Sequence, residues 1–291
     1  MPDIDMNRLE YGATGWDFAN DTDLRFQGET YRDVYEYQWE LPGYRYSSRY
    51  MGDDLAIDGA GRLSGGTVET YSERVWTGSD YWELWRMTGA SIDADALQAA
   101  IDSPSTADDQ AVYRQAFRGD DLFRLSINDD IAWAHRGNDT LRGAAGDDVL
   151  GGNAGNDRVS GEAGDDRLIG GAGRDHLTGG AGADVFVFNS AGQTRLGGAD
   201  LIADFDEGED LISLRGIDAS TALGGNNAFV WLGERAIGTG AGGEIQMRQL
   251  DRAGTANDVT LLRIDTDADR APEAELRLAG LHDLGADDFL L

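Results

Sequence analysis

Apolar and polar residues alternate with two different periods along this chain, and the change of period divides it into three regions. Up to residue 133, apolar side chains recur at every second position in runs such as 35–39 and 67–71, which is typical of half-buried β-strands. From 134 to 187 an apolar residue recurs at one fixed place in every nine. Further strand-like runs follow at 185–188, 211–214, 259–262 and 275–278.

The first region, 1–133, reads as a β-rich module that is also rich in Tyr and Trp. Turns of glycine and aspartate at 52–54 and 58–61 separate its strands, which favours an antiparallel sandwich or meander. Two short helices are predicted over 93–101 and 108–118, since both begin at aspartates suited to an N-cap and Gly119 can end the second.

The middle region, 134–187, is an internal repeat of six nine-residue units: AHRGNDTLR, GAAGDDVLG, GNAGNDRVS, GEAGDDRLI, GGAGRDHLT and GGAGADVFV. Position four is glycine and position six is aspartate in all six units, and position eight is always apolar. The apolar residues are Leu141, Leu150, Val159, Leu168, Leu177 and Phe186. A degenerate unit precedes them, with Asn128 and Asp130 in the same register.

This period predicts a parallel β-roll. Glycine at the turn positions permits positive φ, so each unit can form a six-residue turn followed by a three-residue strand with one inward apolar side chain. Two units then make one coil, and stacking at about 4.8 Å places the position-six aspartate of one unit beside that of the second unit after it. Two carboxylates about 5 Å apart repel by roughly 3 kcal/mol at an effective dielectric of about 20, so we expect a cation between them.

The donor atoms available in the repeat indicate which cation it would bind. The chain has no cysteine, which excludes disulfides, thiol catalysis and cysteine-based zinc sites. Carboxylates and turn carbonyls are hard ligands that suit Ca²⁺ better than zinc or copper, and Mg²⁺ is a poorer match because it demands strict octahedral geometry.

The net charge of the chain disfavours two classes of binding partner. With 54 acidic and 24 basic residues the formal charge is -30, which would repel nucleic acid and anionic membrane surfaces. No stretch is apolar enough to span a membrane, and residues 1–6 lack the basic and apolar segments of a cleavable signal, so we expect any export to use another route.

The repeat resembles the RTX, or hemolysin-type, calcium-binding repeat, whose consensus is G-G-x-G-x-D-x-U-x. In that family each ion lies between units i and i+2, so the resemblance implies that Asp139 pairs with Asp157, Asp148 with Asp166, Asp157 with Asp175, and Asp166 with Asp184, with about four interior ions. The first unit begins with Ala134 and His135 where the family has two glycines, so it departs from the consensus.

The chain beyond the repeat resembles the C-terminal domain of the serralysin family, through 179–188 and the D-x-I-x-D-F spacing of 200–205. In those relatives this segment closes the roll, which implies further ligands at Asp200 and Asp204. The acidic-then-apolar end, 287–291, resembles the uncleaved signal of type I secretion substrates; an ordinary final strand is the alternative.

The resemblance implies the following carboxylate and carbonyl ligands: Gly137, Asp139, Gly143, Ala145, Gly146, Asp148, Gly152, Ala154, Gly155, Asp157, Gly161, Ala163, Gly164, Asp166, Gly170, Gly171, Ala172, Gly173, Asp175, Gly179, Gly180, Ala181, Gly182, Asp184, Asp200 and Asp204.

Enzyme motifs of the relatives are missing from the sequence. There is no H-E-x-x-H helix, and the three histidines, His135, His176 and His282, are scattered; His176 is expected to be an exposed strand residue. No G-x-S-x-G elbow occurs either. A glycosidase or lyase could still use N-terminal acids such as Glu36, Glu40 and Glu83, because paired carboxylates have no fixed spacing.

Two other sequence patterns resemble binding sites, but each also has a simpler structural interpretation. Asp265, Asp267 and Asp269 begin like an EF-hand loop, but Arg270 replaces the required glycine and Leu276 the bidentate glutamate, which favours a solvated acidic hairpin. The N-terminal aromatics could stack on sugar rings, although core packing is the simpler role. They are Tyr35, Tyr37, Trp39, Tyr44, Tyr46, Trp76, Tyr81, Trp82 and Trp85.

Together these features predict a mainly β protein with three parts: an N-terminal β-sandwich-like module with short helices (1–133), a parallel β-roll (134–187) and a β-rich cap with a secretion signal (188–291). The predicted function is an extracellular calcium-binding RTX protein, exported by type I secretion, that presents a binding or adhesive module. A polysaccharide-active enzyme with an RTX tail is the alternative.

Overall fold

The computed structural model describes strands within residues 13–93 and, more fully, residues 117–219, 229–237, 243–251, 258–267 and 271–291. The chain forms two compact units. The first comprises residues 1–125 and 135–137, and the second comprises residues 126–134 and 138–291.

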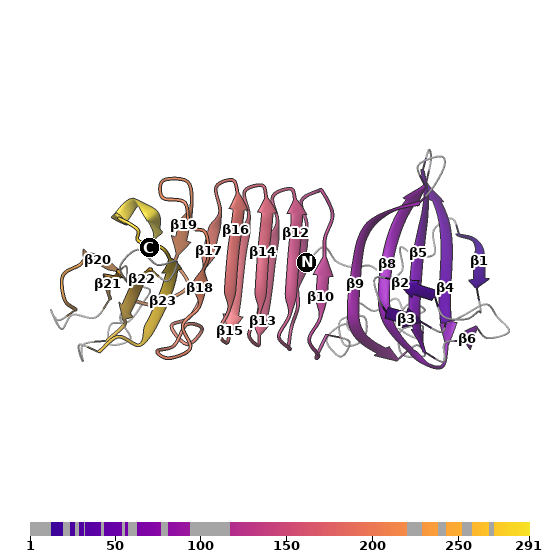
Figure 1. Cartoon of the computed structure of the whole chain (residues 1–291), viewed down its shortest axis with the longest axis horizontal. Helices are drawn as coiled ribbons and strands as arrows, with labels where there is room; N and C mark the ends of the chain where they lie inside the picture. The colour runs from indigo at the N-terminus through magenta and orange to yellow at the C-terminus, as the bar shows by residue number, and fades with distance from the viewer. Residues whose placement is uncertain are drawn as a thin grey trace. The chain divides into compact units, whose positions relative to one another are not determined.

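The first unit contains an antiparallel sheet in the strand order β1-β4-β5-β8-β9-β10 (Figure 1). Its strands are β1 (Ala13–Ala19), β4 (Asp33–Leu41), β5 (Tyr44–Asp53), β8 (Thr67–Trp76), β9 (Tyr81–Asp93) and β10 (Leu122–Arg124). Two small pairs accompany it: β2 (Leu24–Phe26) with β3 (Glu29–Tyr31), and β6 (Ala56–Ile57) with β7 (Leu63–Ser64). The strands predicted at 35–39 and 67–71 lie within β4 and β8 and are confirmed.

Other predictions for this unit remain partly untested. Residues 94–116, which contain most of both predicted helices, lie outside the described residues, but Phe117 and Arg118 form a bend, so the second helix prediction is wrong at its end. The strand order is that of a meander, and a second sheet packed against it stays a prediction.

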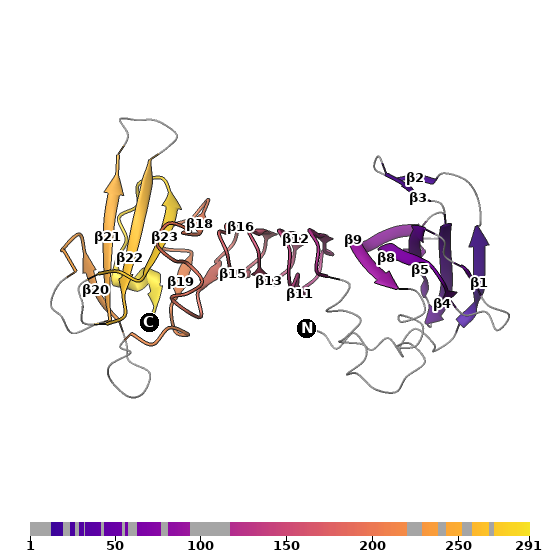
Figure 2. The ribbon, with the colours of Figure 1, turned by 90° about the horizontal axis from the view of Figure 1, so that it is seen from below.

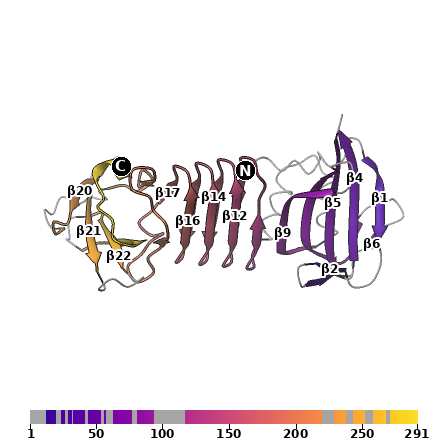
Figure 3. The same cartoon turned by 45° about the horizontal axis from the view of Figure 1, so that its top comes forward.

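The second unit is built on a parallel β-solenoid with two sheets, visible as stacked coils in Figures 1 and 3. One sheet has the order β11-β13-β15-β17-β19-β24, and the other contains β12-β14-β16-β18-β23. The strands are β11 (Ile131–Trp133), β12 (Thr140–Ala145), β13 (Val149–Ala154), β14 (Arg158–Ala163), β15 (Arg167–Ala172), β16 (His176–Ala181), β17 (Val185–Val187), β18 (Leu201–Ile202), β19 (Leu211–Ser213), β23 (Ala274–Ala279) and β24 (Phe289–Leu290).

The nine-residue period fixes the register of these strands. Leu141 pairs with Val159 and Val159 with Leu177, while Leu150 pairs with Leu168, so residues 18 apart face each other in each sheet. Every position-eight side chain from Leu141 to Phe186 is almost completely buried. The predicted inward apolar row is therefore confirmed, and it forms the core of the solenoid.

Parallel pairing continues past the repeat at both ends. Before it, β11 pairs with β13, which confirms the degenerate unit. After it, β16 pairs with β18 and β18 with β23 in one sheet, while β17 pairs with β19 and β19 with β24 in the other. The solenoid therefore extends beyond residues 134–187, because the D-L-I segments at 200 and 210 supply strands in the same register.

A sheet extension follows at the C-terminal end, beyond β23 (Figure 2). It consists of β20 (Val230–Gly233), β21 (Glu244–Leu250) and β22 (Val259–Asp265), with β21-β22-β23 antiparallel and β20-β21 parallel. Among the described residues the only helical element is a short 3-10 turn, η2 (Ala286–Asp288), and none of their helices could cross a membrane. The mainly β prediction is confirmed.

Candidate metal centre

The position-six aspartates form two buried columns, one along each row of turns of the solenoid. In the first column the Oδ1 atoms of Asp148, Asp166 and Asp184 accept the backbone N–H of the aspartate one coil earlier, at 2.7 to 2.9 Å. In the second, Asp157 and Asp175 do the same at 2.8 Å. The predicted stacking of aspartates 18 residues apart is confirmed.

The second carboxylate oxygen of these side chains, Oδ2, has a different environment from Oδ1. In Asp148, Asp166, Asp175, Asp184 and Asp200 the Oδ2 atom is buried and has no hydrogen-bond partner. An unsatisfied buried carboxylate oxygen is costly, because burial removes water without replacing its hydrogen bonds. These atoms therefore mark positions where a cation would fit.

Glycine at position one shapes the space around each carboxylate. A Cβ atom added to Gly161 would overlap the Oδ2 atom of Asp166 in the same unit. The corresponding pairs are Gly143 with Asp148, Gly152 with Asp157, Gly170 with Asp175 and Gly179 with Asp184. At these five positions glycine leaves room for the carboxylate, which explains the position-one glycine of units two to six in terms of the site; the first unit has Ala134 there.

Glycine at position four has a separate role in the turn. Gly164 has φ of 137°, and a Cβ there would overlap the carbonyl oxygen of Gly146 in the preceding coil. Position two also has positive φ, although His135, Ala144, Asn153 and Glu162 occupy it, with φ between 72° and 81°. Both turn positions therefore need the left-handed region, and the glycine prediction is confirmed at position four.

Turn carbonyls link successive coils. Those of Ala163, Ala172 and Ala181 at position three each accept a backbone N–H from the position-four glycine of the preceding coil, at 2.9 Å. A carbonyl oxygen has two lone pairs, so one remains on each. Combined with the free Oδ2 atoms, the site offers oxygen donors only, the set that Ca²⁺ prefers.

The two columns continue past the repeat with different spacing. Asp175 donates its backbone N–H to Oδ1 of Asp200 at 2.8 Å, and Asp184 donates to Oδ1 of Asp210 at 3.0 Å. The structure thus places Asp200 in the second column, while Asp204 binds the turn by accepting the N–H groups of Gly179 and Gly180 at 2.9 and 3.0 Å.

Asp210 is a column residue that sequence reasoning missed. It ends the first column, and its other oxygen, Oδ2, accepts the backbone N–H of Asp206 at 2.9 Å. The signal was present, since 210–212 repeats the Asp-Leu-Ile of 200–202.

Burial and neighbouring charges raise the pKa values of several aspartates in the columns. Burial raises the pKa of Asp148 and of Asp184 to about 7 and that of Asp175 to about 6, and neighbouring carboxylates add to the effect at Asp148 and Asp184. Burial likewise raises the pKa of Asp200 to about 8 and that of Asp166. Without a cation, ionising these groups opposes folding.

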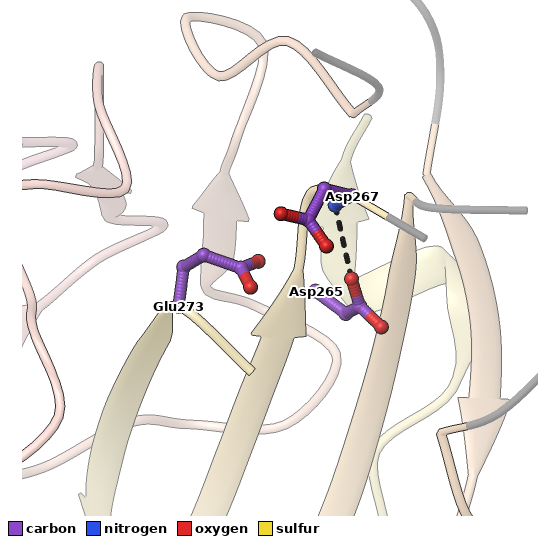
Figure 4. A group of neighbouring side chains, drawn as sticks. All are labelled: Asp265, Asp267 and Glu273. Carbon is purple, nitrogen blue, oxygen red and sulfur yellow. Dashed lines mark hydrogen bonds between the residues drawn. The ribbon is translucent and has the colours of Figure 1, made fainter. Parts of the chain in front are cut away.

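Three further carboxylates meet where β22 turns toward β23 (Figure 4). One oxygen from each of Asp265, Asp267 and Glu273 lies within 4.8 Å of the others. Asp265 is only 2% exposed, so the expectation of a solvated hairpin is wrong at this residue, which pairs with Glu244 of β21. Burial, and then the nearby charges of Glu273, Asp267 and Glu244, raise the pKa of Asp265. Asp269 and Arg270 lie outside the described residues.

The other predicted residues lie only partly within the described part of the chain. His176 is exposed on β16, as expected, and Nδ1 of His282 lies 3.1 Å from Oε1 of Glu207. Glu36, Glu40 and Glu83 lie on β4 and β9, but their side chains, like those of the N-terminal aromatics, are outside the described residues.

The raised pKa values give a prediction for the metal-free protein. A group whose pKa is higher in the folded state stabilises the fold below its unfolded pKa of about 3.9, and this contribution is lost as pH rises through the folded value. We therefore expect the solenoid in excess chelator to gain strand signal in circular dichroism as pH falls from 8.5 to 5. The double variant Asp148→Asn, Asp184→Asn should reduce this dependence. A strand signal that falls over the same range would contradict it.

Comparison with known proteins identifies the second half of the chain. Two solved structures from Azotobacter vinelandii, the AlgE6R3 and AlgE6R2 subunits of mannuronan C5-epimerase, are similar with 24% and 29% identity and TM-scores of 0.34 and 0.38. The matches cover 59% and 57% of this chain and 77% and 91% of those subunits. No curated protein matches. The family described as Peptidase M10 serralysin C terminal matches residues 119–291, more than half of the chain, which therefore belongs to this family.

Proposed function

We propose that the protein is a secreted calcium-binding protein whose solenoid folds when Ca²⁺ enters the aspartate columns. The observation that carries the proposal is the set of buried Oδ2 atoms without a hydrogen-bond partner, stacked beside glycines that leave room for them. A divalent cation would cancel the repulsion between stacked carboxylates and give each such oxygen a partner.

The proposed ligands are the position-six aspartates, from Asp139 to Asp184, with Asp200 and carbonyls of the turns. About four ions would bind between repeat units, as in the RTX resemblance, and Asp200 would extend the second column. The oxygen-only donor set, the absence of cysteine and the exposure of His176 all favour Ca²⁺ over zinc.

Calcium binding of this kind would make folding depend on location. Calcium is scarce in cytosol and about millimolar outside cells, and an ion that binds only the folded state stabilises it by a free energy that grows with the logarithm of the ion concentration above the Kd. An open chain could pass through a type I secretion apparatus and close outside. The acidic end of the chain supports this proposal by its resemblance to a type I signal, and in the folded state Phe289 and Leu290 form β24.

For the N-terminal module we propose a binding or adhesive role, with carbohydrate as the candidate ligand. Its Tyr and Trp content supports this, since aromatic rings stack on sugars. A glycan array followed by turnover assays on any hits separates the proposal from its alternative: we expect binding without product, and release of product would identify a polysaccharide-active enzyme instead.

A calcium titration tests the central proposal. We expect chelator-treated protein at pH 8 to lack part of its strand signal in circular dichroism and to regain it with a midpoint at about 10⁻⁴ to 10⁻³ M Ca²⁺, a range typical of extracellular calcium modules. Hydrogen exchange should locate the gain in residues 138–290. Mg²⁺ at equal concentration serves as the control. A solenoid fully protected in excess chelator would overturn the proposal.

A glycine variant tests the geometry of the site. In Gly161→Ala the new Cβ would displace the carboxylate of Asp166, so we expect the calcium midpoint to rise roughly tenfold. The matched control is Gly198→Ala, where the nearest atom to the new Cβ is 3.9 Å away. Equal midpoints for the two variants would refute the assignment.

A further inference from the structure

Position five of the repeat forms a second hydrogen-bonded column, outside the buried aspartates. Asp147 donates its backbone N–H to Oδ1 of Asp129 at 2.9 Å, Asp165 donates to Asp147 at 2.9 Å, and Ala183 donates to Asp165 at 2.8 Å. These side chains accept from the next coil, whereas the position-six aspartates accept from the preceding one. The outer column therefore ties successive coils together independently of the inner column.

The outer column differs between the two rows of turns. Alternate repeat units turn at opposite edges of the solenoid, which Figure 1 shows as two rows of turns. On the other edge the outer acceptors are amides: Asn156 donates its backbone N–H to Oδ1 of Asn138 at 2.8 Å, and Arg174 donates to Asn156 at 2.9 Å. We call the row with Asp129, Asp147 and Asp165 the acidic edge, and the row with Asn138 and Asn156 the amide edge.

The backbone ladder does not require the charge of the acidic edge. Asp147 and Asn138 use the same atom, Oδ1, for the same bond at nearly the same length. The outer side chains of both edges are exposed. Because the hydrogen bonds are equivalent, the charge is an additional difference that the fold itself does not need.

Other charges enlarge the difference. At position two, the acidic edge has the exposed Glu162, where the amide edge has Asn153 in the preceding unit and Gly171 in the next. Near the end of the acidic edge, the carboxylate of Asp204 binds Gly179 and Gly180. On the amide edge, position five of the last unit is instead the exposed Arg174.

We infer that the position-five residues set the calcium affinity of each edge, so that the acidic edge fills at lower calcium than the amide edge. This inference rests on the proposed calcium sites of the inner columns. Each outer carboxylate lies next in sequence to an inner aspartate and attracts a divalent ion without binding it directly. Across water-exposed distances of several ångström, two such charges change affinity by roughly 3- to 10-fold, and salt weakens the effect.

Charge exchange between the edges tests the inference in the full chain. Asp147→Asn with Asp165→Asn removes two charges from the acidic edge while keeping an Oδ1 acceptor for each ladder bond. Asn138→Asp with Asn156→Asp adds two charges to the amide edge. Isothermal titration of chelator-treated protein with CaCl₂ would measure the affinities, and circular dichroism in saturating calcium would verify the fold.

We expect two classes of site in the native chain. The first variant should weaken the tighter class roughly 3- to 10-fold, and the second should strengthen the weaker class by a similar factor. If folding merges the classes into one transition, its calcium midpoint should rise in the first variant and fall in the second. Raising KCl from 0.05 to 0.5 M should weaken the native tight class more than the weak class.

Inner-column variants assign the classes to edges. Asp166→Asn should remove sites of the tighter class and Asp157→Asn sites of the weaker class. Midpoints that stay unchanged in both charge-exchange variants, or that move in the same direction, would overturn the inference while calcium binding persists. A native chain that binds no calcium at all would instead refute the proposed function.

Discussion

Repulsion between stacked carboxylates is the constraint on which the solenoid depends. Parallel coils must lie about 4.8 Å apart for their ladders to form, so a nine-residue repeat with aspartate at position six brings identical charges together. The backbone N–H of the preceding coil satisfies one oxygen of Asp166, but the other oxygen has no hydrogen-bond partner. The stable solutions are a bound cation or a proton, and the raised pKa values of the columns express the second of these.

The glycines follow from the same constraint. Gly161 leaves space for the carboxylate of Asp166, and Gly164 lets one turn approach the carbonyl of the turn before it. These are separate requirements, which explains why the repeat needs glycine at both position one and position four. Position two accepts Ala144 and Glu162 at positive φ with local backbone strain, whereas a Cβ at Gly171 or Gly180 would overlap a backbone carbonyl of the preceding coil.

The sequence predicts the contacts correctly where the nine-residue period alone decides them. Once two units make a coil, Leu141 must face Val159 and Asp139 must lie beside Asp157, and both hold in the structure. Beyond the repeat the spacing becomes 25 and 26 residues, set by loops whose length obeys no period. Asp200 was found there only through family resemblance, and Asp210 was missed. Asp265 looked solvated because its buried partner, Glu244, lies on a strand 21 residues away.

The structural repeat of this sequence is therefore a pair of units, 18 residues long, and not the single nonapeptide. Read singly, position five appears variable: Asn, Asp, Asn, Asp, Arg, Ala. Read in pairs, it separates into Asp147, Asp165 and Ala183 on one edge and Asn138, Asn156 and Arg174 on the other, because alternate units turn at opposite edges. A consensus that averages all units loses this distinction, although the backbone bond is the same on both edges and only the charge differs. Residues that vary without an obvious pattern along the sequence can therefore produce a regular difference in charge between the two edges of the folded solenoid.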